Sequence, residues 1–190
     1  MRIGKASSAF GRLRKPLWSR RNISTCTKLR VFNAAVMSVL LYGAATWCPT
    51  QADLSKLEVF QMSCLRSICG VSLRDRLHNA EIRLRCQNQP TVETKLRHIR
   101  LRWLGHVARM DNSKICHKLW LAQKPAAWRC ARNAPKKTWD KLVTADLSFL
   151  KQTYGAALWS RSCASIITDL AQDRTQWRRL ITAGQSTAIT

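Results

Sequence analysis

Acidic residues are scarce in this sequence of 190 residues. It contains 10 Asp and Glu against 33 Lys and Arg, which gives a formal net charge of +23. No acidic residue precedes Asp53, and none lies between Asp111 and Asp140. A surplus of this size repels itself unless an anion neutralises it, and the commonest candidates are nucleic acids and membrane surfaces. The clustering of the cations is typical of a phosphate-binding surface, so we expect a nucleic-acid partner rather than a small-molecule substrate.

The spacing of a disulfide scaffold and a secretory signal are also absent. The eight cysteines are scattered, and Met1 leads into charged and polar residues instead of an apolar segment. These features favour a reducing compartment and an intracellular protein, cytoplasmic or nuclear. The Arg- and Ser-rich start leaves a mitochondrial transit peptide as an alternative. A zinc site would draw on His106, Cys116, His117 and Cys130, which lack the short Cys spacing of structural zinc sites, so we expect no metal or other cofactor.

Residues 90–110 carry the clearest helical pattern in the chain. One face is apolar, and its members are Val92, Leu96, Ile99, Trp103, Val107 and Met110. The other face is basic, and its members are Lys95, Arg97, His98, Arg100, Arg102, His106 and Arg109. Pro90 suits a first helical turn, and Thr91 or Gln89 can cap it. The pattern predicts a helix that packs through its Trp103 side and offers cations to a polyanion; a solvated face without a partner is the alternative.

The most hydrophobic segment spans residues 29–47, where the pattern predicts another helix. Residues 31–48 carry no charge, and their number reaches the lower limit for a membrane span. Polar residues dilute this run, so we predict a buried core helix that Pro49 ends. A small basic protein with a membrane-associated helix at 31–48 is the alternative.

Further helices are expected on both sides of the 90–110 segment. Residues 53–70 form an amphipathic pattern that ends at Gly70, with Cys64 and Cys69 as core thiols. Asn79 is expected to cap a short helix before Cys86. After Pro135, a helix begins whose apolar face includes Asp146, and residues 156–183 form one or two more helices.

The predicted fold is therefore all-α, a basic helical bundle followed by a smaller helical tail. We expect the bundle at residues 1–110, a basic connector at 111–138, the helical tail at 139–183 and a frayed terminus at 184–190.

Seven segments in order resemble one protein family. They are FGRL (10–13), FNAAVMSVLLYGAATW (32–47), LEVFQMSCLRSICG (57–70), RDRLHNAEI (74–82), RWLGHVARM (102–110), APKKTW (134–139) and QDRTQWRRL (172–180). Together they resemble the thumb and following tail of non-LTR, LINE-type retrotransposon reverse transcriptases, and RWLGHVARM is the most specific piece. Asn133 and Ala134 depart from the Arg-Gly-Arg-Pro run common in relatives, which weakens phosphate contact there.

The resemblance implies a fragment of an RNA-directed DNA polymerase that is not an enzyme by itself. Polymerases of this family hold two metal ions with palm aspartates, usually in an Asp-Asp turn, and the chain has no adjacent Asp-Asp pair. We therefore expect it to begin beyond the palm, to lack the endonuclease domain and to have no catalytic residue. What remains is sequence-independent binding to the backbone of an RNA–DNA or DNA duplex, unless the chain is a non-functional remnant. The residues expected to contact phosphates are Arg97, Arg100, Arg102, Arg109, Lys136, Lys137, Arg12, Arg14 and Lys15.

Overall fold

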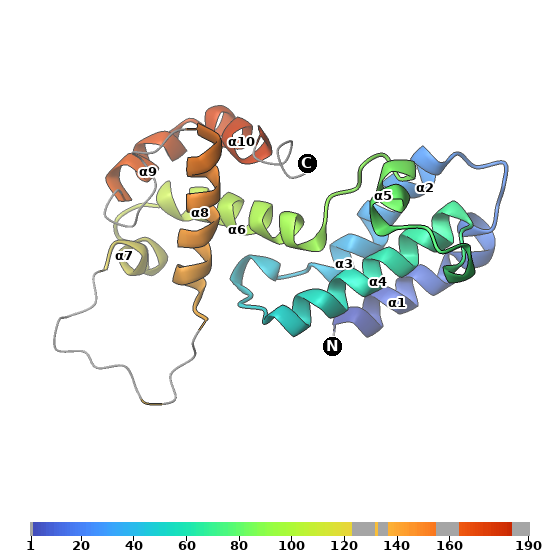
Figure 1. Cartoon of the computed structure of the whole chain (residues 1–190). Helices are drawn as coiled ribbons and strands as arrows, with labels where there is room; N and C mark the ends of the chain where they lie inside the picture. Colours follow the sequence, from blue (N-terminus) through green and yellow to red (C-terminus); the bar gives the residue numbers. More distant parts are fainter. Residues whose placement is uncertain (1, 123–131, 133–136, 155–163, 184–190) are drawn as a thin grey trace. The chain divides into compact units, whose positions relative to one another are not determined.

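The computed structural model describes residues 2–122, 132, 137–154 and 164–183, and every regular element in these ranges is helical (Figure 1). The all-α prediction is therefore confirmed. The chain divides into two compact units. Unit 1 comprises Met1–Ala44 and Pro49–Lys95, and unit 2 comprises Ala45–Cys48 and Leu96–Thr190. The division falls inside helix α6 (Val92–Ala108), whereas the sequence suggested a boundary at 110.

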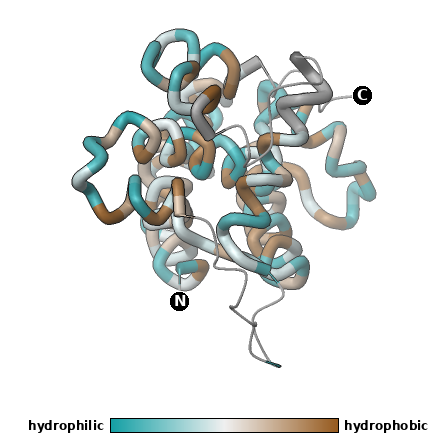
Figure 2. Tube along the Cα trace, turned by 90° about the vertical axis from the view of Figure 1, so that its left-hand side faces the viewer, coloured by the Kyte–Doolittle hydropathy of each residue, from teal (hydrophilic) through white to brown (hydrophobic). Residues whose placement is uncertain are grey.

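Unit 1 is built from five α-helices and the first turn of α6. The five are α1 (Arg2–Arg12), α2 (Thr25–Val31), α3 (Ser38–Leu40), α4 (Gln51–Cys69) and α5 (Asn79–Arg85). Helix α1 packs against α3 and α4, and α4 packs against α2 and α5. Hydrophobic and hydrophilic residues are interspersed along the chain, as the colours of Figure 2 show, and the longest of these helices, α4, buries Leu57, Gln61, Met62, Cys64, Leu65 and Ile68.

Local capping explains where α2 and α4 begin and end. The Ser24 hydroxyl accepts the backbone N–H of Thr27 at 3.2 Å, as expected for a residue before a helix. Thr50 and Asp53 form a reciprocal capping box at the start of α4. Gly70 ends α4 in the left-handed conformation with φ of 67°, which confirms the predicted stop.

The hydrophobic segment after Ser24 does not form the single helix predicted for residues 29–47. Helix α2 continues through a π-helical stretch at Phe32–Met37 and stops with α3 at Leu40. Gly43 then has φ of 72°, and Ala44–Thr46 form a 3-10 turn. Within the described residues, no helix has both the length and the apolar character needed to cross a bilayer.

Three aromatic side chains pack together in unit 1. The rings of Phe10 and Trp18 stack with their centroids 4.9 Å apart, and Phe32 meets Phe10 edge to face. Trp18 also donates its indole N–H to the carbonyl of Phe10 at 2.8 Å. Lys28 is buried, and its ammonium group donates to the Trp18 carbonyl at 3.0 Å. This lysine therefore belongs to the interior of unit 1 rather than to its charged surface.

Polar side chains of α4 hold the start of α6 in place. Glu58 accepts the backbone N–H of Val92 at 3.1 Å and forms an ion pair with Arg83. Gln61 is buried and donates to the Pro90 carbonyl at 3.0 Å. Thr91 accepts the N–H of Thr94, which confirms it as the cap of α6. Asn79 was the wrong choice as the cap of α5, because His78 precedes the first helical residue and the Asn79 side chain accepts from Arg66 instead.

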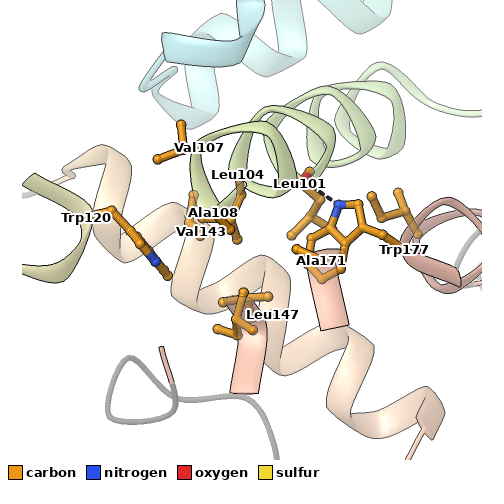
Figure 3. Close-up of a cluster of buried hydrophobic side chains, with 11 residues drawn as sticks. Leu101, Leu104, Val107, Ala108, Trp120, Val143, Leu147, Ala171 and Trp177 are labelled. Atoms are coloured by element: carbon orange, nitrogen blue, oxygen red, sulfur yellow. Dashed lines mark hydrogen bonds between the residues drawn. The ribbon is translucent and has the colours of Figure 1, made fainter. Parts of the chain in front are cut away.

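Unit 2 surrounds the part of α6 that begins at Leu96. Its other helices are α7 (Ile115–Leu121), α8 (Trp139–Tyr154), α9 (Ala164–Gln172) and α10 (Arg174–Ala183). Their buried side chains form one cluster with α6, shown in Figure 3: Leu101, Leu104, Val107, Ala108, Trp120, Val143, Leu147, Ile167, Ala171, Trp177 and Ile181. The buried face of α6 is therefore wider than the predicted stripe, and the predicted members Trp103 and Met110 lie at its edge.

The contact between Trp177 and Gly105 brings α10 directly against α6. The Trp177 indole N–H donates to the Leu101 carbonyl at 3.1 Å, drawn as a dashed line in Figure 3, and the side chain is 2% exposed. A Cβ atom added at Gly105 would lie only 2.6 Å from Cδ1 and 2.8 Å from Cε2 of this indole. Only glycine leaves room for the ring, so Gly105 sets the distance between the two helices.

Replacing Gly105 with alanine tests this close approach. We expect Gly105→Ala to lower the free energy of unfolding by about 1–3 kcal/mol, because the overlap displaces Trp177 from the core. Gly4→Ala is the matched control, since nothing lies within 4 Å of a Cβ at that helical position. The control should raise stability by roughly 0.5–1 kcal/mol. Urea denaturation followed by circular dichroism measures the stability of both variants. Equal effects of the two changes would contradict the close contact between Gly105 and Trp177.

Candidate nucleic-acid interface

Arg100 lies in the interior of unit 2 and not on a basic surface. Its side chain is 5% exposed and binds the carboxylate of Asp146 in a bidentate arrangement. The Nε atom is 2.7 Å from Oδ2, and Nη2 is 3.1 Å from Oδ1. A guanidinium committed in this way cannot contact phosphate. The expected role of Arg100 is therefore corrected: it joins α6 to α8.

Arg97 shares the same carboxylate from one turn earlier. Its Nε atom lies 3.4 Å from Oδ1 of Asp146, and its side chain is 20% exposed. This ion pair directs the Arg97 side chain toward α8, although the single negative charge of Asp146 is shared with Arg100. His98 also adds less charge than expected, because burial and then the neighbouring Arg102 lower its pKa. The first two turns of α6 are consequently much less cationic at their surface than their sequence suggests.

The remaining cations of α6 meet those of α10 around a pocket of about 520 Å³ in unit 2. Arg102, His106 and Arg109 come from α6 and the residue that follows it, and Arg174 and Arg178 come from α10. The pocket is completed by Ala45, Ile99, Trp103 and Trp177. We call this set the α6–α10 pocket. No carboxylate lines it among the residues that the structure describes.

Helical spacing on α6 and α10 places the cationic side chains of the pocket near one another. Residues three and four apart share one face of a helix, so Arg102, His106 and Arg109 point to the same side of α6. Arg174 and Arg178 are likewise one turn apart on α10. Because Trp177 is buried against Gly105, α10 presents these two arginines beside the cations of α6.

Electrostatic repulsion within the pocket is visible at Arg109. Burial lowers the pKa of Arg109, and the positive charges of Arg174 and Arg178 lower it further. Its Nη1 atom donates to the Ala171 carbonyl at 2.6 Å, while its buried Nε–H has no hydrogen-bond partner among the described residues. Arg102, Arg174 and Arg178 form no ion pair within the described part of the chain. A bound anion would relieve this repulsion.

An aromatic surface borders the same cations. The ring centroids of Trp103 and His106 lie 5.3 Å apart, and the ring planes are inclined by 51°. Trp103 is half-buried. Arginine and tryptophan side chains together suit a nucleic-acid backbone, where phosphates alternate with apolar sugar and base surfaces.

Of the predicted phosphate-binding residues that the structure describes, two lie at the α6–α10 pocket. Arg102 and Arg109 line the α6–α10 pocket. Lys137 is exposed in unit 2, and Lys136 lies outside the described residues. Arg12, Arg14 and Lys15 are exposed in unit 1.

The sequence analysis placed His106 on the basic face of residues 90–110 but missed Arg174 and Arg178 as members of the site. Arg174 and Arg178 are four residues apart, so they share one face of α10. That spacing, next to a tryptophan, was the available signal.

The described residues contain no cluster of three or more His, Cys, Asp or Glu side chains that could hold a metal ion. Cys130, one of the potential zinc ligands considered above, lies outside them.

Comparison with known proteins gives one partial match. A family described as a domain of unknown function, DUF6451, matches residues 9–42, which lie in unit 1. No curated protein and no solved structure matches the chain. The match covers the end of α1, all of α2 and α3, and none of the α6–α10 pocket, so the site has to be interpreted from its own chemistry.

The Arg100–Asp146 pair can be tested by removing one charge. Asp146→Asn keeps the shape of the side chain but leaves a buried guanidinium without its counter-charge. We expect a loss of about 3–5 kcal/mol in the free energy of unfolding. The double variant Arg100→Met with Asp146→Leu should recover most of the loss, whereas Asp146→Leu alone should not. Urea denaturation of the wild type, Arg100→Met, Asp146→Leu and the double variant measures the coupling, and additive effects of the two single changes would contradict a buried pair.

The environment of Lys95 makes the stability of the fold depend on pH. Its ammonium group donates to Asn33 at 2.8 Å and to Gln89 at 3.4 Å. Burial, followed by repulsion from Arg83, lowers the pKa of Lys95 from its ordinary value of 10.5 to about 8, and Glu58 opposes part of the shift. Between these two values the unfolded chain binds more protons than the folded one, so the stability of the fold rises with pH.

We therefore expect the free energy of unfolding to increase between about pH 8 and pH 10.5, by on the order of 3 kcal/mol from this group. Below about pH 8 the group is protonated in both states and contributes no slope. Urea midpoints across this range, compared between the wild type and Lys95→Met, isolate the contribution. Parallel curves for the two proteins would show that the pKa of Lys95 is not lowered.

Proposed function

We propose that the chain binds the phosphate backbone of duplex nucleic acid, an RNA–DNA hybrid or DNA, without reading its sequence. The observation that carries this proposal is the α6–α10 pocket, where four arginines and a histidine gather and no carboxylate of the described residues lines the wall. Phosphate oxygens are the natural partners of such a cluster, because guanidinium groups bind them through paired N–H donors. Backbone contacts of this kind position a protein on a duplex and carry no sequence information.

In the proposed role, each cation acts through charge and hydrogen bonding. Arg102, Arg174 and Arg178 are exposed and reach outward to phosphates, while Arg109 is half-buried and strengthens the local positive potential. Trp103 offers an apolar surface beside them. No bond is made or broken in this scheme, so it requires neither a catalytic residue nor a cofactor.

We further propose that the chain is a piece of a retrotransposon-encoded RNA-directed DNA polymerase that does not polymerise by itself. Two of the segments on which that resemblance rests, RWLGHVARM and QDRTQWRRL, lie far apart in sequence. They supply most of the residues that line the α6–α10 pocket and also the Gly105–Trp177 contact. Their convergence on one site supports a shared role in holding nucleic acid, as expected for a thumb-like element.

Binding to a labelled RNA–DNA hybrid across a salt series tests the proposal. For the wild type we expect a steep fall in affinity with salt and similar affinities for duplexes of unrelated sequence. The variant with Arg102, Arg174 and Arg178 all changed to Ala should lose about 2–3 from the slope of log K against log salt, because up to three phosphate contacts disappear.

The matched control changes Arg20, Arg21 and Arg74 to Ala. These three arginines are exposed in unit 1, so the control loses the same net charge at other sites. Equal losses in the two variants would mean that total charge, and not the α6–α10 pocket, determines binding. Absence of binding by the folded wild type at low salt would identify the chain as a non-functional remnant.

A further inference from the structure

Cys69 and Cys86 form a close thiol pair in unit 1. Their Sγ atoms lie 3.0 Å apart, although 17 positions separate them in the sequence. Cys69 is the last residue of α4, and Cys86 directly follows the last residue of α5. Gly70 turns the chain away after Cys69, and the Cys86 N–H bonds back to the Ile82 carbonyl at 3.0 Å. Both cysteines are therefore held at helix ends that pack together.

The two sulfur atoms differ in their access to solvent. Cys86 is fully buried, and its Sγ atom lies 3.9 Å from the Leu65 carbonyl. Cys69 is half-buried and can be reached from outside. A small reagent that enters this site meets Cys69 first, with Cys86 directly behind it.

Charge and hydrogen bonding favour the thiolate of Cys69. A hydrogen bond from Cys86 is the largest cause that lowers the pKa of Cys69 to about 7, and Arg85 and Lys28 add smaller effects in the same direction. The same hydrogen bond, together with burial, raises the pKa of Cys86. The proton shared by the pair therefore resides on Cys86, and a substantial fraction of Cys69 is ionised at neutral pH.

We propose that Cys69 and Cys86 are a redox-sensitive pair that hydrogen peroxide converts to an intramolecular disulfide. A disulfide requires an S–S distance of about 2.05 Å, so the two sulfur atoms have to approach by roughly 1 Å. This displacement is available through small side-chain rotations at the helix ends. The resulting bond joins the ends of α4 and α5 covalently.

The reaction balances with peroxide as a two-electron oxidant. The Cys69 thiolate attacks one peroxide oxygen, the O–O bond breaks, and the departing hydroxide takes a proton to become water. Cys69 is then a sulfenic acid. The Cys86 sulfur attacks the Cys69 sulfur, the S–S bond forms as the S–O bond breaks, and the hydroxide released takes the Cys86 proton. Two thiols and one peroxide thus give one disulfide and two waters.

Other cysteines in unit 1 lack one or more of these properties. Cys64 is buried, and burial raises its pKa to about 12, so it is an inert thiol. Cys26 is exposed but has no neighbouring sulfur atom among the described residues. These two cysteines provide internal references for a reaction that is specific to the pair.

The experiment treats the folded, reduced full-length chain with increasing hydrogen peroxide at neutral pH, then alkylates free thiols and digests with trypsin. Cys69, Cys86 and Cys64 fall in the separate tryptic peptides 67–74, 86–95 and 57–66. We expect a linked 67–74/86–95 species that dithiothreitol reverses. It should appear at peroxide doses several-fold below those that oxidise Cys26.

Two variants define the roles of the sulfur atoms. Cys86→Ser should retain a sulfenic acid on Cys69, detectable with dimedone, because no second thiol follows. Cys26→Ser is the matched control and should form the disulfide at the wild-type dose. Oxidation of Cys69 to the sulfinic acid without the linked peptide would overturn the proposal. Formation of the link only in denaturant, with each fold checked by circular dichroism, would also overturn it.

Discussion

The small number of carboxylates constrains the whole structure. Asp146 is committed to Arg100 and Arg97, Glu58 to Arg83 and the start of α6, and Asp53 to a helix cap. Each of these carboxylates satisfies a group on which folding depends, since a buried arginine or an uncapped helix end carries a large cost. No described carboxylate lines the α6–α10 pocket, so its cations have no counter-charge there.

For helix α6, the hydrophobic pattern of the sequence predicted the helix and part of its buried face, but not the burial of Arg100. Its existence, its start after Thr91 and the burial of Val92, Leu96 and Val107 all agree with the sequence prediction. The burial of Arg100 does not, because a pattern analysis assigns every charge to the exposed face. Its partner Asp146 lies 46 positions away, and only the tertiary fold brings the two together. A carboxylate on the apolar face of the helix after Pro135 was the signal that a buried ion pair existed.

The candidate site could be predicted only in part for the same reason. Arg102 and Arg109 followed from the basic face of α6, but the contribution of α10 depends on the approach of Trp177 to Gly105. A glycine within a helix indicates close packing without naming the partner. The thiol pair was equally hidden: Cys69 was expected in the core, and nothing in the spacing of the cysteines pointed to Cys86. The Arg100–Asp146 pair, the contribution of α10 to the pocket and the Cys69–Cys86 pair all depend on contacts between residues far apart in the sequence, which a local pattern does not predict.

One face of helix α10 contributes both to the core of unit 2 and to the α6–α10 pocket. Trp177 fills the core of unit 2, while Arg174 and Arg178 border the α6–α10 pocket. If the pocket binds phosphate as proposed, folding of the unit and occupation of the pocket are linked equilibria, because an anion that binds only the assembled site shifts the population toward the folded state by mass action. The repulsion among the arginines acts in the opposite sense when the pocket is empty. Under the proposed function, the stability of unit 2 therefore depends on the anions around it.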